Sequence, residues 1–265
     1  MNYSERSALR FGPLILEVDS KWDSLQILDQ WRVDPTQEAK VKVCISTEYV
    51  IPTTHWVKGD SPPIGWTATS LYFERHDFQI FYRPNYFSVY IRCTANALHS
   101  LAPLQVLLSE LAQNIGGLLL HACAGVYQGK GYLVPGRSET GKSTIAREAG
   151  FDQVLSDEAV LLLPNEDQTM TLYGTPFWSE GRILPLCSMD VALSTVLIPI
   201  QSNQLSLYEI EPIETAVALL KSVFSYRESD ENRVILFERC CEISSVTKSA
   251  GLLFPKKGPW ISMIS

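Results

Sequence analysis

The sequence predicts an α/β protein of mixed α+β character, with a small β-rich domain over residues 1–95 and a second domain over residues 96–265. Aromatic residues concentrate in the first 90 positions, within runs of β-type patterning. After residue 95, helical and strand-like segments are interspersed, which is typical of an α/β arrangement. A length of 265 residues with 46% hydrophobic residues accommodates two modest domains with cores of their own.

In the first domain, the run 41–46 predicts a strand. Two further strands are expected within residues 70–93, on either side of a turn at Arg83-Pro84-Asn85. The proline- and glycine-containing segment 59–63 predicts a loop.

The second domain opens with a predicted helix that begins near Pro103 and ends at Gly116-Gly117. Its leucines recur at helical spacing: Leu104, Leu107, Leu108 and Leu111. Strands are then expected over 118–127 and 131–135, and a short helix that ends at Ala149. The remaining expected elements are strands over 154–163, 169–173 and 195–199 and helices over 212–226 and 232–246.

Charge and cysteine content exclude several classes of function. The formal net charge of −7 gives no basic footprint for nucleic acid. No segment is apolar for long enough to predict a membrane span, and residues 1–12 lack the apolar core of a signal peptide. The six cysteines show no CxxC pair and no metal-ligand spacing. We therefore expect a cytoplasmic protein with neither nucleic acid nor membrane as a partner.

A glycine-rich motif carries the strongest chemical signal. Residues 136–143 match GxxxxGK[ST], in which backbone N–H groups surround phosphate oxygens and the helix N-terminus favours negative charge. Lys142 would reach the β- and γ-phosphates, and the Ser143 hydroxyl would bind Mg²⁺. The alternative is a strand-to-helix turn without a ligand. The expected binding residues for ATP or another nucleoside triphosphate are Gly136, Arg137, Ser138, Glu139, Thr140, Gly141, Lys142, Ser143 and Thr144.

Two further features accompany this motif. The acidic pair Asp157-Glu158 follows Lys142 after only 15 positions, at the end of a short strand. One carboxylate can hold a metal ion while the other accepts a proton from a hydroxyl, although such a pair can also be a solvated strand edge. His121 lies in an apolar strand, where a histidine is more often a core residue than a catalyst.

Taken together, these segments resemble the C-terminal kinase domain of HPr kinase/phosphorylase, which shares a P-loop kinase superfamily with phosphoenolpyruvate carboxykinase. The resemblance rests on LLLHA (118–122), YLVPGRSETGKST (132–144) and VLSDEAVLL (154–162). It implies a P-loop kinase domain of this type in the second half of the chain. Residues 1–95 do not resemble the usual regulatory domain of that enzyme.

The resemblance also implies roles for individual residues. Asp157 would be the general base on the acceptor hydroxyl, Lys142 and His121 would act in catalysis, and Glu158 would help to place Mg²⁺ beside Ser143. Glu180, in the segment 173–181, occupies the place of a metal-side glutamate of the family.

Two departures from the family qualify these expectations. Glu139 stands where the family loop usually has glycine, so it brings a negative charge and a side chain to a position that favours φ > 0. The basic loop through which the family contacts its protein substrate is not recognisable.

The sequence therefore predicts an ATP- and Mg²⁺-dependent phosphotransferase whose acceptor is a serine of a protein or peptide. The alternatives are a small-molecule kinase of the same superfamily and a non-catalytic nucleotide-sensing module. The sequence does not decide whether the reverse, phosphorylase reaction also occurs. It does not decide the oligomeric state either, with a homo-oligomer as one option because related domains often form rings.

Overall fold

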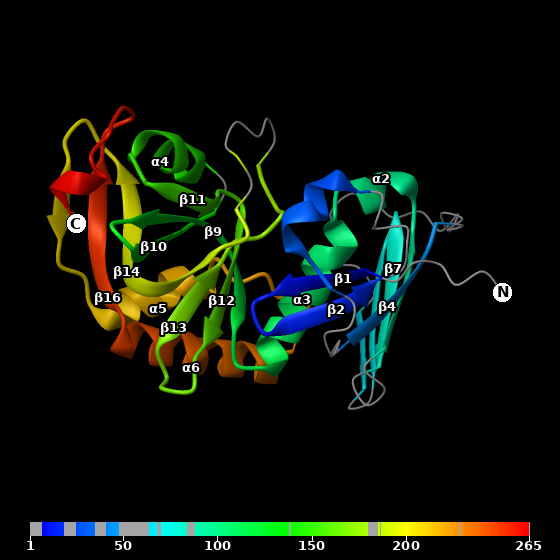
Figure 1. Ribbon diagram of the computed structural model, residues 1–265. Helices are drawn as coiled ribbons and strands as arrows, with labels where there is room; N and C mark the ends of the chain where they lie inside the picture. Colours follow the sequence, from blue (N-terminus) through cyan, green and yellow to red (C-terminus); the bar gives the residue numbers. More distant parts are fainter. Residues whose placement is uncertain are drawn as a thin grey trace. The chain divides into compact units, whose positions relative to one another are not determined.

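A computed structural model describes most of the chain as two compact units (Figure 1). The first unit comprises Met1–Leu108 and Tyr226–Glu228, and the second comprises Ser109–Ser225 and Ser229–Ser265. The residues described are 7–18, 25–34, 41–47, 64–67, 70–83, 88–137, 139–179, 185, 187–227 and 229–264, with only the backbone for 64–67, 70 and 71. The predicted loop at 59–63, Pro84 and Asn85 of the predicted turn, Ser138 and Glu180 lie outside these residues.

In the described part of the first unit, eight strands form one sheet in the order β3-β1-β2-β4-β8-β7-β6-β5. The predicted strand at 41–46 is confirmed as β4, whose alternate residues Val41, Val43 and Ile45 are buried. The strands are β1 (Ser7–Phe11), β2 (Leu14–Val18), β3 (Arg32–Val33), β4 (Val41–Ser46), β5 (Ile64–Thr67), β6 (Ser70–Arg75), β7 (Phe78–Arg83) and β8 (Ser88–Cys93). The helical elements are η1 (Gln26–Trp31), α2 (Ala95–His99) and α3 (Ala102–Asn114). The division between the two units falls within α3, after Leu108.

Residues 70–93 contain three strands where the sequence predicts two. The additional reversal is a two-residue hairpin turn, because Arg75 pairs with Phe78 in the β6–β7 register. Asp77 stabilises this turn by accepting hydrogen bonds from the Arg75 guanidinium, at 2.5 and 2.7 Å. A continuous run of β-forming residues conceals such a turn, which has neither glycine nor proline to mark it.

The second unit is built around a closed five-stranded barrel. Its order is β10-β9-β12-β13-β14, and parallel pairing of β14 with β10 closes it. Beyond the barrel, β16 pairs with β14 in parallel and β15 pairs with β16 in antiparallel orientation, while β11 pairs with β9. The strands are β9 (Leu118–Tyr127), β10 (Lys130–Pro135), β11 (Gln153–Ser156), β12 (Ala159–Pro164), β13 (Met170–Tyr173), β14 (Asp190–Gln201), β15 (Ser206–Tyr208) and β16 (Lys248–Phe254). The helical elements are α4 (Lys142–Glu148), α5 (Pro212–Leu220), α6 (Asp230–Val246) and η3 (Ile261–Met263).

This architecture corrects the expected fold class. The prediction of an α/β (mixed α+β) chain with a P-loop kinase domain of the HPr kinase and phosphoenolpyruvate carboxykinase type is wrong, because a sheet-rich barrel and a large mixed sheet occupy its place. Strand β9 pairs in antiparallel orientation with β10, β11 and β12, and β13 pairs in the same orientation with β12 and β14. The parallel pairs are β10–β14 and β14–β16. Apolar periodicity identifies strands but does not state their partners.

Helices lie on two sides of this unit. In Figure 1, α4 lies on one side of the strands, and α5 and α6 lie on the other. Leu219 of α5 and Leu236 of α6 join the core cluster of the barrel strands, whereas Ile145 of α4 packs with Phe254 and Trp260 in a second cluster. Strand β9 is consequently buried on both faces. Its exceptions are His121 and the terminal Tyr127, and His121 opens onto the site described below.

The helix predicted over 212–226 ends at Leu220. Beyond it the chain pairs with β9, since the His121 N–H donates to the Ser222 carbonyl at 2.7 Å and Leu120 forms a bridge with Val223. Tertiary hydrogen bonding thus ends the helix where local periodicity would extend it.

Candidate functional site

The glycine-rich motif forms a loop between β10 and α4. Its first residue is tied to β9, because the Gly136 N–H donates to the His121 carbonyl at 3.2 Å. Thr140 then folds back, and its Oγ1 donates to the Arg137 carbonyl at 2.9 Å. A Cβ on Gly136 would lie 2.5 Å from that Oγ1, so the tight turn requires glycine. The loop is therefore a tight turn at the end of a buried strand, and hydrogen bonds within the loop itself stabilise it.

Two residues of the loop have left-handed backbone conformations. Gly141 has φ +97° and is packed against the Phe254 ring, which a Cβ would approach to 2.6 Å. Glu139 has φ +69°, a region that non-glycine residues adopt at a cost of about 1–2 kcal/mol. A glycine at this position would adopt the same backbone conformation without that cost.

Lys142 begins α4 and is almost fully enclosed, at 5% exposed. Its Nζ donates to the Arg137 carbonyl at 2.8 Å, which holds the ammonium beneath the loop. Burial lowers the pKa of Lys142, and the nearby charges of Glu158 and Asp157 act in the opposite direction. The site therefore contains one buried cation between the loop and two carboxylates.

A serine organises the acidic turn between β11 and β12. Buried Ser156 accepts hydrogen bonds from the N–H groups of Glu158 and Ala159, both at 3.2 Å, and donates to the Phe177 carbonyl at 2.7 Å. The side chain therefore fixes the turn that carries Asp157 and ties it to the segment after β13.

Asp157 lies behind Ser179 at 6% exposed. Its Oδ1 accepts from the Ser179 N–H at 3.1 Å, and its Oδ2 accepts from the Ser179 hydroxyl. The same hydroxyl lies 3.4 Å from Ser143 Oγ. Asp157, Ser179 and Ser143 thus form a continuous hydrogen-bonded chain from the acidic turn to the first turn of α4.

Glu158 points to the other side of the turn, toward His121. His121 Nε2 and Glu158 Oε1 are 3.6 Å apart. This interaction lowers the pKa of Glu158, with a smaller contribution from Lys142, although partial burial acts against them. The His121 ring also lies 5.7 Å from the Phe224 ring, centroid to centroid. The histidine is therefore neither fully enclosed in the core nor free in solvent.

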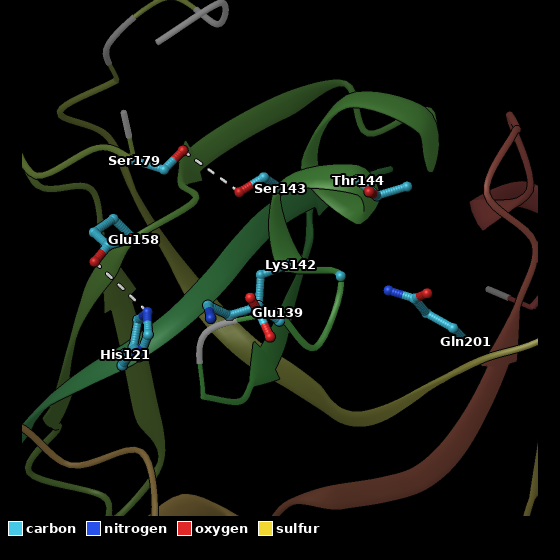
Figure 2. A pocket seen from close by; sticks show the side chains of 9 residues that line it. His121, Glu139, Lys142, Ser143, Thr144, Glu158, Ser179 and Gln201 are labelled. Atoms are coloured by element: carbon cyan, nitrogen blue, oxygen red, sulfur yellow. Dashed lines mark hydrogen bonds and ion pairs between the residues drawn. The ribbon is translucent and has the colours of Figure 1, made fainter. Parts of the chain in front are cut away.

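These groups surround one pocket of about 370 Å³ (Figure 2). Figure 2 shows Ser143 facing Ser179 and His121 facing Glu158. The predicted residues that line it are His121, Glu139, Gly141, Lys142, Ser143, Thr144 and Glu158. Gly136, Arg137 and Thr140 build the loop, and Asp157 lies behind the wall.

Ser179 and Gln201 also line the pocket, and the sequence reasoning missed both. Ser179 follows Asp157 by 22 positions in a segment without helical or strand periodicity, so no pattern linked the two residues. Gln201 is the last residue of β14, and it comes near the loop only because β14 lies beside β10 and β16.

The donor set of the pocket combines a lysine, hydroxyl groups and one carboxylate of the acidic turn. Among the described residues, no group of three or more His, Cys, Asp or Glu side chains is placed to hold a metal. Mg²⁺ needs fewer protein ligands, because it keeps several waters and binds one or two carboxylates plus substrate phosphates. Ser143 and Glu158 line the pocket, whereas both carboxylate oxygens of Asp157 accept hydrogen bonds from Ser179 behind its wall.

Comparisons with known proteins do not assign the chain to a family, since neither a protein-family model nor a curated protein matches it. In the part of the chain that the structure describes, no helix is both long enough and apolar enough to cross a membrane.

Proposed function

We propose that this chain is an ATP- and Mg²⁺-dependent phosphotransferase that acts on a hydroxyl group, with a serine of a protein or peptide as the acceptor. One observation carries the proposal: a buried lysine, a loop of the GxxxxGK[ST] type and Glu158 from a separate turn meet at one pocket, and Asp157 of the same turn is hydrogen-bonded to the lining residue Ser179. The proposal rests on this site and not on the fold class.

Binding of the triphosphate is assigned to the loop and Lys142. The Lys142 ammonium would exchange its bond with the Arg137 carbonyl for phosphate oxygens, a charge-assisted contact that is stronger than a neutral one. Thr144 and Gln201 add polar groups at the rim of the same pocket. Magnesium, held by Ser143 with Glu158 or Asp157, would neutralise phosphate charge.

Proton transfer is assigned to Asp157. Its carboxylate already accepts a hydrogen bond from a serine hydroxyl, which is the contact a general base makes with an alcohol acceptor. Glu158, paired with His121, adds a second carboxylate at the pocket. The chain would then act by positioning and charge neutralisation, which dominate phosphoryl transfer.

The test is transfer of labelled γ-phosphate from ATP to a library of serine-containing peptides in the presence of Mg²⁺. Wild type should label a subset of peptides. Asp157→Asn should reduce transfer by about 10²–10⁴-fold, the usual contribution of a general base, and should still bind nucleotide. Lys142→Ala should bind nucleotide about 10–100-fold more weakly and should lose transfer.

A nucleotide-sensing module is the second candidate, favoured by the exposed carboxylate of Glu139 beside the pocket. It predicts tight nucleotide binding without transfer to peptides or to hydroxyl-bearing metabolites, and no effect of Asp157→Asn. Transfer to a metabolite but not to peptides would instead identify a small-molecule kinase.

A further inference from the structure

Ser179, in the segment 173–181, has an unusual position for a residue that was not predicted to act in the site. Its hydroxyl donates to Asp157 Oδ2, and its backbone N–H donates to Asp157 Oδ1 at 3.1 Å. The same hydroxyl lies 3.4 Å from Ser143 Oγ and contributes to the wall of the pocket, together with Lys142. A serine therefore occupies the place where an acceptor alcohol would meet both the base and the phosphate site.

The segment before Ser179 is anchored by buried contacts. Thr175 Oγ1 donates to the Ala159 carbonyl, and the Phe177 carbonyl accepts from Ser156. Gly174 passes so close to Cys187 that a Cβ would lie 1.8 Å from its carbonyl oxygen. These contacts keep residues 174–179 against the acidic turn, so the Ser179–Asp157 contact is built into the fold of the segment.

From this geometry we infer that Ser179 is an intramolecular phosphate acceptor: the chain phosphorylates its own Ser179. The inference rests on the proposed function, because ATP bound at the loop would be the donor. It also defines the acceptor class as a primary seryl hydroxyl presented on an irregular, backbone-anchored segment.

The chemical step is an ordinary phosphoryl transfer. The Ser179 Oγ lone pair forms a bond to the γ-phosphorus, and the bond between that phosphorus and the β–γ bridging oxygen breaks, which releases ADP. The Ser179 proton passes to Asp157 and then to solvent. No oxidant or further reactant is needed.

The product would change the site. A phosphoserine at 179 can no longer donate its hydroxyl proton to Asp157, and its negative charge would be repelled by that carboxylate and attracted by Lys142. The hydrogen-bonded chain from Asp157 to Ser143 would therefore be broken.

The experiment is incubation of the full chain with ATP and Mg²⁺, followed by peptide mapping by mass spectrometry. Phosphate is expected on Ser179 in wild type, and labelling of that peptide should fall by at least about 100-fold in Asp157→Asn. Labelling should disappear in Lys142→Ala and Ser179→Ala. Ser206→Ala, which removes an exposed hydroxyl from β15, is the matched control and should keep wild-type labelling.

Two further measurements test whether transfer occurs within one molecule and whether the variants are folded. Unlabelled wild type is mixed with isotopically labelled Lys142→Ala, which retains Ser179, and transfer within one molecule predicts that the Ser179 peptide of Lys142→Ala carries no phosphate. Thermal melting checks that each variant is folded, and Ser179→Thr, which restores a hydroxyl, should recover part of the labelling.

The failures can be told apart. If wild type phosphorylates an added serine peptide while Ser179 stays unmodified or another serine takes the label, the inference is overturned and the proposed function stands. Phosphate on Ser179 of Lys142→Ala in the mixture would also overturn transfer within one molecule. If wild type neither binds nor turns over ATP, the proposed function itself fails.

Discussion

At the scale of single residues, the site depends on groups whose chemistry is set by their neighbours. Lys142 is a buried cation facing two carboxylates, and Glu158 is a carboxylate held in its charged form by His121. The loop motif and the acidic pair could be predicted from sequence, because short spacings identify them. Ser179 was not predicted, although it directly precedes the predicted Glu180, because its bonds to Asp157 are tertiary contacts of an irregular segment.

The lowered pKa of Glu158 predicts a pH-dependent contribution to stability. A group with a lowered folded-state pKa stabilises the protein above its unfolded-state pKa, about 4.3 for glutamate, and this stabilisation is lost as pH falls through the folded value. Glu158→Gln should therefore be less stable than wild type at neutral pH by no more than about 1 kcal/mol, because the pair is partly exposed.

Urea unfolding across this pH range measures the difference. The gap between wild type and Glu158→Gln should close below about pH 4.3. Glu166→Gln removes an exposed carboxylate from a turn and controls for net charge. A gap that is independent of pH would contradict the assignment of the His121–Glu158 interaction.

Gly141 predicts a steric requirement in the loop. Gly141→Ala would add a methyl group at φ +97° and place it 2.6 Å from the Phe254 ring, so both backbone strain and overpacking should destabilise the chain, by about 2–4 kcal/mol in total. Gly129→Ala is the matched control, since Gly129 has φ +72° and open space around it. It should cost only about 1 kcal/mol in chemical unfolding. Equal losses would contradict the packing argument.

Glu139 predicts an effect of charge on nucleotide affinity. Its carboxylate lines the pocket and would repel phosphate, so Glu139→Gln should bind MgATP severalfold more tightly in calorimetry, with a larger gain at low salt. Glu148→Gln, which lies at the end of α4 and outside the pocket lining, should leave affinity near the wild-type value. Weaker binding by Glu139→Gln would show that this side chain assists the ligand.

At the scale of elements, strand positions were predicted better than strand partners. The strand expected over 118–127 is confirmed as β9, and α4 lies where a short helix was expected. The closure of β14 onto β10 joins residues about sixty positions apart, and no local pattern encodes that pairing. The same kind of non-local contact ended α5 before the predicted residue.

Packing of α6 onto the barrel strands predicts a strong difference between adjacent residues. Leu236 is 3% exposed and belongs to the barrel core cluster, so Leu236→Ala should reduce the free energy of unfolding by about 2–5 kcal/mol. Ile235, its neighbour on the same helix, is 45% exposed, and Ile235→Ala should change it by about 0.5 kcal/mol or less. Chemical denaturation measures both variants. Comparable losses would place the buried face of α6 elsewhere.

At the scale of the whole molecule, an acidic chain with a net charge of −7 is proposed to bind an anionic ligand. The overall charge does not prevent this, because the buried Lys142 provides a positive charge at the pocket itself. Length and composition allowed one large domain or two modest ones, and the patterning along the chain predicted two, but neither revealed that the second contains a closed barrel. The proposed nucleotide site therefore depends on the geometry of its own residues and not on the fold class.

Calorimetric titration of MgATP into wild type and Lys142→Ala tests the central claim most directly. Wild type should bind one equivalent, and Lys142→Ala should bind about 10–100-fold more weakly, which corresponds to loss of a charged hydrogen bond worth about 1.5–3 kcal/mol. Absence of binding to wild type, or equal affinity of the two proteins, would contradict the assignment of this pocket as a nucleotide site.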